Sequence, residues 1–437
     1  MERKNILGLV NDVVAGKDLK KKEAAINAIW EEAGKEGVFP ASIHDLYRAR
    51  GEGQWSGCTV PAMNLRSLTF DLARAIFRSA LKINAGAFIF EIARSEMGYT
   101  DQKPLEYTTV ILAAALYESY RGPVFIQGDH FQVNAKNFAK DSKTEVEGLK
   151  KLIKESIDAG FYNIDIDSST IVDLSQEDLL AQQKLNSEIC AELTVYIRAL
   201  QPQGVTISVG GEIGEVGTKN STPEDLKAFM KLYLARLPEG VEGISKISVQ
   251  TGTSHGGVVL PDGSIAKVSL DFDTLKRISE VAKNEYKMAG AVQHGASTLP
   301  ENAFHKFPEV ETAEVHLATQ FQNMIYDSTH FPRDLKTKVY DWLKVEAKSE
   351  MKAGMTDDQF FYKARKKALG AFKADIMGIK DRELIAGEVE KTFAFLFDQL
   401  KIKDSAKLVA KFIKPVNITK KFDLTHDKKA EHFEGDD

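Results

Sequence analysis

Residues 146–169 read VEGLKKLIKESIDAGFYNIDIDSS and contain one complete unit of the fold. Apolar residues recur at steps of three and four over Val146–Ala159, which predicts an amphipathic helix. Gly160 marks its end, because glycine takes the left-handed backbone that stops a helix. The apolar run Phe161–Ile166 then predicts a buried strand. A helix that leads directly into such a strand is typical of a parallel sheet.

The same unit recurs along the chain. Eight apolar runs, each too short for a helix, predict strands buried on both faces: Thr59–Asn64, Ala87–Ile92, Pro123–Gln127, Phe161–Ile166, Val205–Val209, Ile244–Gln250, Ala291–Gln293 and Val315–Ala318. Segments of helical period separate them: Leu68–Lys82, Leu105–Tyr120, Val146–Ala159, Gln176–Leu200, Pro223–Leu237 and Leu275–Lys283. Six strands have a glycine at or just before their start, where we expect left-handed backbone: Gly86, Gly122, Gly160, Gly204, Gly243 and Gly290.

Eight alternating units predict an α/β fold, a closed (β/α)8 barrel of the TIM type, with an open doubly wound sheet as the alternative. Such a barrel needs about 250 residues, which residues 58–329 supply. Residues 1–57 and 330–437 are predicted to be helical extensions. The second contains helical patterns at Leu335–Glu350, Asp358–Ala374 and Glu383–Leu400 and ends in a charged tail. We expect the extensions to cover the barrel surface or to form a subunit interface.

Composition narrows the class of protein. A hydrophobic fraction of 43% with 28% charged residues is ordinary for a globular protein. A net charge of −5 over 437 residues, without a basic arm, argues against a nucleic-acid partner. Two cysteines far apart exclude a disulfide framework and a multi-cysteine zinc site. Because no stretch predicts a signal sequence or a membrane span, we expect a cytoplasmic protein with no membrane partner. We also expect a homo-oligomer.

Residues suited to chemistry follow the predicted strands, at the end where barrels of this type carry their active sites. Four of the nine histidines lie there: His130, His255, His294 and His316. Carboxylates such as Asp167 follow other strands. One such histidine alone would be interpreted as an ordinary hydrogen-bonded residue. Four, together with carboxylates, predict a zinc site, because zinc binds imidazole nitrogen and carboxylate oxygen and leaves a position open for substrate.

The later strand ends also predict an anion site. Gly256 and Gly257 follow one candidate ligand and Gly295 follows another, while Ser297 and Thr319 stand after the seventh and eighth strands. Loops at these positions commonly bind phosphate through backbone N–H groups. We therefore expect a phosphate to bind there without a lysine or arginine beside it. Ordinary tight turns are the alternative interpretation.

From about Pro61 to Gln320, these strand ends resemble the class II fructose-bisphosphate/tagatose-bisphosphate aldolase family. The matching segments are Asp129-His130, Asp167, Glu212-Ile-Gly214, Gly252-Thr-Ser-His255-Gly256 and His294-Gly-Ala-Ser-Thr298. The resemblance implies a zinc enzyme in which Asp129 is the acid/base and His130, His255 and His294 bind the metal. It also implies that Glu212 can hold zinc in an alternative position and that Asp167 lies beside the metal.

Four positions depart from the family pattern. Gln127 replaces a histidine, Ala296 replaces a glycine of the phosphate loop, and the acids of the loop near Glu215 do not align. His316 stands where the family has an asparagine that contacts the substrate.

The resemblance implies cleavage of a phosphorylated ketose to dihydroxyacetone phosphate and an aldehyde. A metal-dependent sugar-phosphate epimerase or isomerase remains an alternative, kept open by His316 and the altered acidic loop. A non-catalytic accessory barrel is a third hypothesis, against which the intact Asp-His and His-Gly segments argue.

Overall fold

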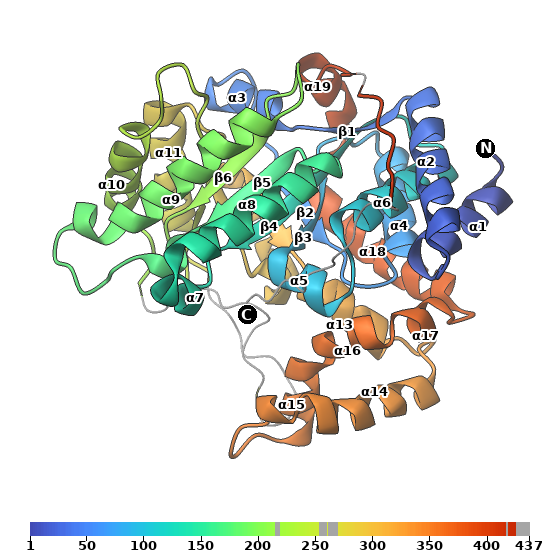
Figure 1. Cartoon of the computed structure of the whole chain (residues 1–437). Coiled ribbons are helices and arrows are strands. Elements are labelled where there is room, and N and C mark those ends of the chain that lie inside the picture. Colours follow the sequence, from blue (N-terminus) through green and yellow to red (C-terminus); the bar gives the residue numbers. More distant parts are fainter. Residues whose placement is uncertain (215–218, 253–259, 261–269, 417, 425–437) are drawn as a thin grey trace.

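The computed structural model of the chain describes residues 1–214, 219–252, 260, 270–416 and 418–424 (Figure 1). Eight parallel strands form a closed barrel, which confirms the predicted fold. They are β2 (Val60–Asn64), β3 (Ile89–Ala93), β4 (Gly122–Gln132), β5 (Asn163–Asp167), β6 (Ser208–Glu212), β7 (Lys246–Val249), β8 (Ala291–Gln293) and β9 (Glu314–Leu317). Each pairs with its neighbours in sequence, and β9 pairs with β2 to close the ring. Among the described residues, no helix combines the length and apolar character needed to cross a membrane.

All eight predicted runs overlap a strand, although several strands begin later than expected. The ladder of β5 starts at Asn163, that of β6 at Ser208 and that of β7 at Lys246. The first residues of each run lead from the helix layer to the barrel before they meet a parallel partner. The runs therefore mark the strands correctly but include part of the preceding connection.

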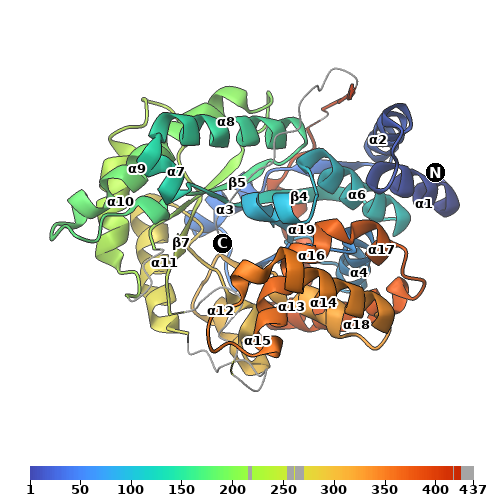
Figure 2. The same cartoon turned by 60° about the horizontal axis from the view of Figure 1, so that its bottom comes forward.

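Helices surround the barrel (Figures 1 and 2). The connecting helices are α4 (Thr69–Lys82), α5 (Arg94–Tyr99), α6 (Pro104–Tyr117), α7 (Ala135–Lys140), α8 (Ser142–Asp158), α9 (Leu179–Leu200), α10 (Pro223–Leu234), α11 (Phe272–Tyr286), α12 (Lys306–Glu309) and α13 (Thr319–Asp327). The apolar core lies between the strands and this layer. There the ring of Phe77 on α4 lies 5.1 Å from that of Phe90 on β3.

Four of the six helix-ending glycines take the expected positive φ: Gly122, Gly160, Gly204 and Gly290. The prediction was wrong for Gly243 and for Gly86, whose φ angles are not positive. Position 86 requires glycine for another reason. A Cβ atom there would lie 2.8 Å from the Cα of Ala406, where the C-terminal extension crosses the base of the barrel.

The N-terminal extension contains α1 (Arg3–Val14), α2 (Leu19–Lys35) and α3 (His44–Gly51), as expected, but also a strand that the sequence did not predict. This strand, β1 (Val38–Ala41), pairs with the first half of β4, next to the point where β5 takes over as partner. Pro40 hid the strand, because proline lacks the N–H of a central strand and is tolerated only at an edge. Asn163 joins the three strands, since its side-chain amide donates to the carbonyls of Ala41 and Ile126 at 3.1 and 2.9 Å.

The C-terminal extension packs along the barrel and over one side of its mouth. It contains α14 (Arg333–Glu346), α15 (Asp357–Ala364), α16 (Ala368–Ala371), α17 (Lys373–Met377), α18 (Arg382–Gln399) and α19 (Ser405–Phe412). Helix α18 packs against α4 and α13. The single helix predicted over residues 358–374 is wrong, because the chain bends there into α15, α16 and α17. Gly370 lies in this segment and allows it to pack closely on α5, since a Cβ atom there would lie 2.8 Å from the carbonyl oxygen of Tyr99.

Four polar side chains, the barrel-floor cluster, fill the barrel below its mouth. The ammonium of Lys246 lies 2.9 Å from Oδ2 of Asp165, 2.5 Å from Oε1 of Glu314 and 2.7 Å from Oε1 of Gln127. All four residues are buried. Gly210 makes room for them, because a Cβ atom on it would lie 2.3 Å from Asp165 and 3.0 Å from Lys246. Strands β4, β5, β7 and β9 are thus connected through one buried cation.

We predict that Lys246→Met lowers the free energy of unfolding of the metal-free protein by about 3–5 kcal/mol, because it leaves buried carboxylates without their cation. Urea titration followed by circular dichroism measures the change. Adding Glu314→Gln to Lys246→Met should recover part of the loss. Lys35→Met, which removes an exposed partner of Glu31, is the matched control and should leave the midpoint unchanged. A Lys246→Met protein as stable as the wild type would show that the cluster does not stabilise the barrel.

Candidate metal and acid–base site

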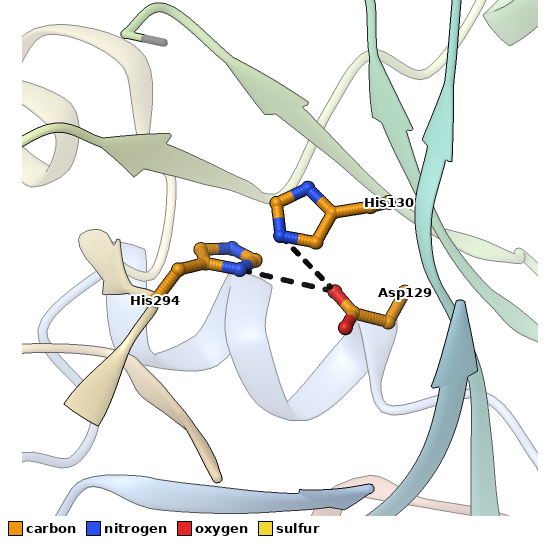
Figure 3. Close-up of side chains that lie close together, drawn as sticks. All are labelled: Asp129, His130 and His294. Carbon is orange, nitrogen blue, oxygen red and sulfur yellow. Dashed lines mark ion pairs between the residues drawn. The ribbon is translucent and has the colours of Figure 1, made fainter. Parts of the chain in front are cut away.

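Three histidines meet at the C-terminal ends of the strands: His130 on β4, His294 directly after β8, and His316 on β9. The ring centroids of His130 and His294 are 4.0 Å apart, as are those of His294 and His316. Figure 3 shows the first two rings facing the carboxylate of Asp129. The structure therefore brings these predicted residues together. The remaining predicted ligand, His255, and the predicted phosphate-binding Gly256 and Gly257 lie outside the described residues.

An irregularity in β4 places both Asp129 and His130 at the mouth. Consecutive residues of a regular strand point to opposite faces. Here the pairing with β5 shifts register between Gly128 and Phe131, and His130 takes a left-handed φ of 40°. Gly128 is required, because a Cβ atom on it would lie 2.4 Å from the ring of Phe131. The bulge re-aims two neighbouring side chains toward one site, as bulges beside active sites commonly do.

Two carboxylates hold His130 from the other side. Its Nδ1 lies 3.1 Å from Oδ2 of Asp167 and 3.2 Å from Oε2 of Glu212. Burial opposes protonation of the imidazole, but Asp129, Glu212 and Asp167 outweigh it and raise the pKa of His130 well above its usual value. Burial, with the charge of Asp167 adding to it, raises the pKa of Glu212 to about 7. Without a metal, this group therefore holds a proton on His130 at neutral pH.

The donor atoms around His130 form two groups that could each hold an ion. In one group, Asp129, His130 and His294, and in the other, His130, Asp167 and Glu212, the donor atoms lie within 4.8 Å of one another. Nε2 of His130 faces Asp129, while Nδ1 faces Asp167 and Glu212. Zinc bonds to nitrogen and carboxylate oxygen at about 2.0–2.2 Å, so small side-chain movements would bring either group onto one ion. The second group matches the alternative zinc position expected for Glu212.

Ser248 on β7 orients the next histidine. Its hydroxyl lies 3.0 Å from Nε2 of His294, which leaves Nδ1 facing Asp129, 3.9 Å from Oδ1. A partner on the second ring nitrogen is typical of metal-binding histidines. Ser248 was not predicted, although it is a hydroxyl residue inside the run Ile244–Gln250, which also contains Ser245 and Lys246.

Asp129 and His316 form an ion pair at the inner end of the site. Nδ1 of His316 lies 3.1 Å from Oδ1 of Asp129 and 3.0 Å from Oε2 of Glu91, while Nε2 lies 2.6 Å from Oε1 of Glu314. Burial opposes protonation of His316, but Glu91 and Asp129 outweigh burial and raise the pKa of His316 well above its usual value. Burial, followed by the charge of Asp129, raises the pKa of Glu91 to about 8. Neither Glu91 nor Glu314 was predicted, although Glu91 is an acid inside an apolar run and Glu314 directly precedes one.

One cavity of about 650 Å³ contains the site. Every predicted site residue within the described part of the chain lines it: Asp129, His130, Asp167, Glu212, His294, Gly295, Ser297, His316 and Thr319. Its volume is within the range of small-molecule sites. The arrangement can therefore enclose a small substrate together with the metal ligands.

The predicted phosphate loop lies beside the histidines. Gly295 has a φ of 68°, and the hydroxyl of Ser297 accepts a hydrogen bond of 2.8 Å from the amide of Ala318, just before α13 begins at Thr319. We expected no cation here. The structure instead places a guanidinium nitrogen of Arg66 3.5 Å from the hydroxyl of Thr319. Arg66 follows β2, the strand next to β9, and therefore reaches across to this loop.

Comparison with known proteins identifies the family. The family model of class-II fructose-bisphosphate aldolases matches residues 51–364. The chain belongs to this family, which supports an aldolase-type function. No curated protein matches the chain in a sequence search.

Solved structures share the fold at low sequence identity. A fructuronate-tagaturonate epimerase from Cohnella laeviribosi is 12% identical over 90% of this chain and 86% of its own, with a TM-score of 0.54. A probable tagatose 6-phosphate kinase from Sinorhizobium meliloti 1021 is 13% identical over 80% and 100%, with a TM-score of 0.55. The fructose-bisphosphate aldolase of Campylobacter jejuni is 17% identical over 84% and 97%, with a TM-score of 0.48.

We predict that zinc binding to the metal-free protein releases about one proton per ion at pH 7, because His130 must lose its proton to bind a metal. Calorimetry in buffers of different ionisation enthalpy measures the release. His130→Ala and His294→Ala should each greatly reduce bound zinc, whereas His330→Ala, which alters a half-exposed histidine paired with Glu388, should not. Full zinc occupancy in both site variants would contradict the assignment.

Proposed function

We propose that the chain is a zinc-dependent aldolase that cleaves and forms the carbon–carbon bond of a phosphorylated ketose, such as fructose 1,6-bisphosphate. The products of cleavage are dihydroxyacetone phosphate and an aldehyde. The observation that carries the proposal is the cluster of Asp129, His130 and His294 at the mouth of a class-II aldolase barrel. Family membership supports aldolase-type chemistry, and the cluster supplies residues for it.

The residues present suit zinc. The donors are imidazole nitrogens and carboxylate oxygens, which zinc prefers, and the second nitrogens of His130 and His294 have orienting partners. His130 and His294 would hold the ion, together with His255 as the sequence predicts. A zinc ion bound there supplies a Lewis acid for the ketose carbonyl.

Asp129 is suited to carry the proton of the reacting hydroxyl. Its Oδ1 lies 3.8 Å from Nε2 of His130 and 3.9 Å from Nδ1 of His294, which places it next to the metal ligands. In cleavage it takes the proton of the C4 hydroxyl while the C3–C4 bond breaks, and in condensation it returns that proton. The contact with His316 stabilises its ionised form and fixes its orientation.

The phosphate end of the substrate would lie on the other side of the histidines. The amides of Gly295 and Ser297 and the start of α13 at Thr319 can donate to phosphate oxygens, and Arg66 adds a charge nearby. Fixing the phosphate there positions the carbonyl carbon beside Asp129 and the metal ligands. Positioning of this kind contributes much of the rate of such reactions.

Epimerisation of a sugar phosphate is the second candidate, favoured by His316. It and Asp129 are two proton carriers in contact at 3.1 Å, and moving a proton at a carbon beside a carbonyl requires such groups. The similarity to the fructuronate-tagaturonate epimerase does not decide between the two reactions, because at 12% identity it concerns the fold alone.

A non-catalytic accessory barrel has less support than either enzyme. Burying Asp129, Asp167 and Glu212 around one imidazole is costly, and a scaffold has no use for this arrangement. Elemental analysis of the purified protein separates this hypothesis from both enzymes, which should contain about one zinc per chain.

We predict that Asp129→Asn lowers the rate of cleavage by about 10²–10⁴-fold, because a positioned acid/base contributes that much. Zinc occupancy should stay at the wild-type value, and the variant should still exchange the C3 proton of dihydroxyacetone phosphate with solvent, which NMR detects. Glu147→Gln, on the exposed side of α8, is the control. If cleavage and exchange fall together while zinc stays bound, the epimerase hypothesis takes precedence. Normal cleavage would move the acid/base role to another residue.

We further predict that His316→Asn keeps cleavage within about tenfold of the wild type, less than the loss of a whole acid/base. The variant has the asparagine that the family carries at this position, and Asp129 retains a polar neighbour. Product analysis by NMR should show cleavage products and no epimer. A loss of cleavage as large as that of Asp129→Asn would instead make His316 part of the proton transfer.

A further inference from the structure

The site cavity has a wall that does not come from the barrel. Residues from the C-terminal extension line it together with the metal-site histidines: Met355, Gln359, Tyr362, Lys363 and Lys366. They belong to α15 and to the turns on either side of it. Figures 1 and 2 show α16, which directly follows this part of the extension, close to α5 and α13, the helices that follow β3 and β9.

This wall is fixed to the barrel through α13. The guanidinium of Arg365 pairs with both carboxylate oxygens of Asp327, at 2.9 and 3.1 Å. The backbone carbonyl of Arg365 accepts a hydrogen bond of 3.2 Å from the hydroxyl of Tyr326. The side-chain amide of Asn323 donates to the hydroxyl of Tyr362 at 3.0 Å. The first residue of α13, Thr319, lines the cavity. The distance between the wall and the predicted phosphate loop is therefore fixed by α13.

A second anchor lies on the opposite side. Helix α16, directly after the wall, packs against α5, and the absence of a side chain on Gly370 allows close contact with the carbonyl of Tyr99. The wall itself is stiffened by the stacked rings of Tyr340 and Phe361, 4.1 Å apart. An element held from two helices can position charges accurately in the cavity.

Charge is distributed unevenly within the cavity. The acids Asp129, Asp167 and Glu212 surround the metal-site histidines at the barrel end. The charged residues that the extension contributes are both lysines, Lys363 and Lys366. The ammonium of Lys363 lies 3.6 Å from Glu350, and that of Lys366 lies 5.6 Å from the ring centre of Tyr99. A cation-rich wall facing an acid-rich metal end attracts anionic groups to the outer part of the cavity.

We propose that α15 and the turn after it form a second anion subsite, in which Lys363 and Lys366 bind a phosphate or carboxylate on the substrate carbon farthest from the metal. This inference rests on the proposed function, since it assigns the substrate's other end. It makes the natural substrate a ketose with anionic groups at both ends. The C-terminal extension, rather than a barrel loop, selects that substrate.

The test compares three ketose 1-phosphates whose far ends carry a hydroxyl, a phosphate or a carboxylate. In Lys363→Gln and in Lys366→Gln, KM for the doubly anionic substrate that the subsite binds should rise about tenfold, because each variant loses one charged hydrogen bond. The kcat should stay within about twofold of the wild type. KM for the hydroxyl-ended substrate should not change. The substrate whose KM responds identifies the anion as phosphate or carboxylate. Lys367→Gln is the matched control, because Lys367 pairs with Glu350 at 2.6 Å and does not line the cavity.

Equal KM values for all three substrates in the wild type and both variants would overturn the subsite and leave the proposed function intact. If the zinc-loaded wild type cleaves none of them, the proposed function fails, and the subsite is tested by calorimetry with inorganic phosphate. Phosphate binding at least several-fold weaker in the double lysine variant than in Lys367→Gln supports the subsite. Equal binding in these two proteins overturns it.

Discussion

The ammonium of Lys246, buried at the floor of the barrel, is the interaction on which the rest of the site depends. It connects Asp165 on β5 to Glu314 on β9, and with Gln127 it fills space that apolar side chains fill in other barrels. Burial opposes the charge, yet Asp165 and Glu314 outweigh it and raise the pKa of Lys246. Lys246 therefore stays protonated, and its charge requires at least one ionised carboxylate beside it. That requirement, rather than close apolar packing, fixes the interior of this barrel.

The effect of this charge extends to the mouth. Burial alone would raise the pKa of Glu314, but Lys246 and His316 lower it to about 2, so Glu314 stays ionised and holds Nε2 of His316. The other ring nitrogen of His316 holds Asp129. Glu91 also faces His316, but burial and the charge of Asp129 outweigh that contact, raise its pKa to about 8 and keep it neutral. Neighbouring carboxyl groups thus take different protonation states because of their surroundings, which is how active sites divide acid and base roles.

Much of this could be predicted from the sequence, because a parallel barrel brings all strand ends to one mouth. Once eight apolar runs were recognised, the segments of His130 and His294 had to end at one mouth, although the bulge that turns both Asp129 and His130 toward it was not predicted. The interior was not predictable in the same way. Lys246 lies inside an apolar run and Glu314 directly precedes one, and only their meeting across the barrel gives them a role. Pro40 concealed β1 for a local reason, since its strand lies at an edge.

The contribution of the C-terminal extension was beyond sequence analysis, because helical periodicity shows that α15 exists but not where it packs. Its position has a physical consequence for the evolution of substrate choice. Residues at strand ends are constrained by one another: moving His130 would disturb Asp129, and through His316 the barrel-floor cluster. The wall formed by α15 contacts none of the floor and is anchored through α13. Substitutions there can change what the cavity binds without altering the protonation states that the chemistry needs. One barrel can therefore accept different substrates by changing the element that closes the cavity.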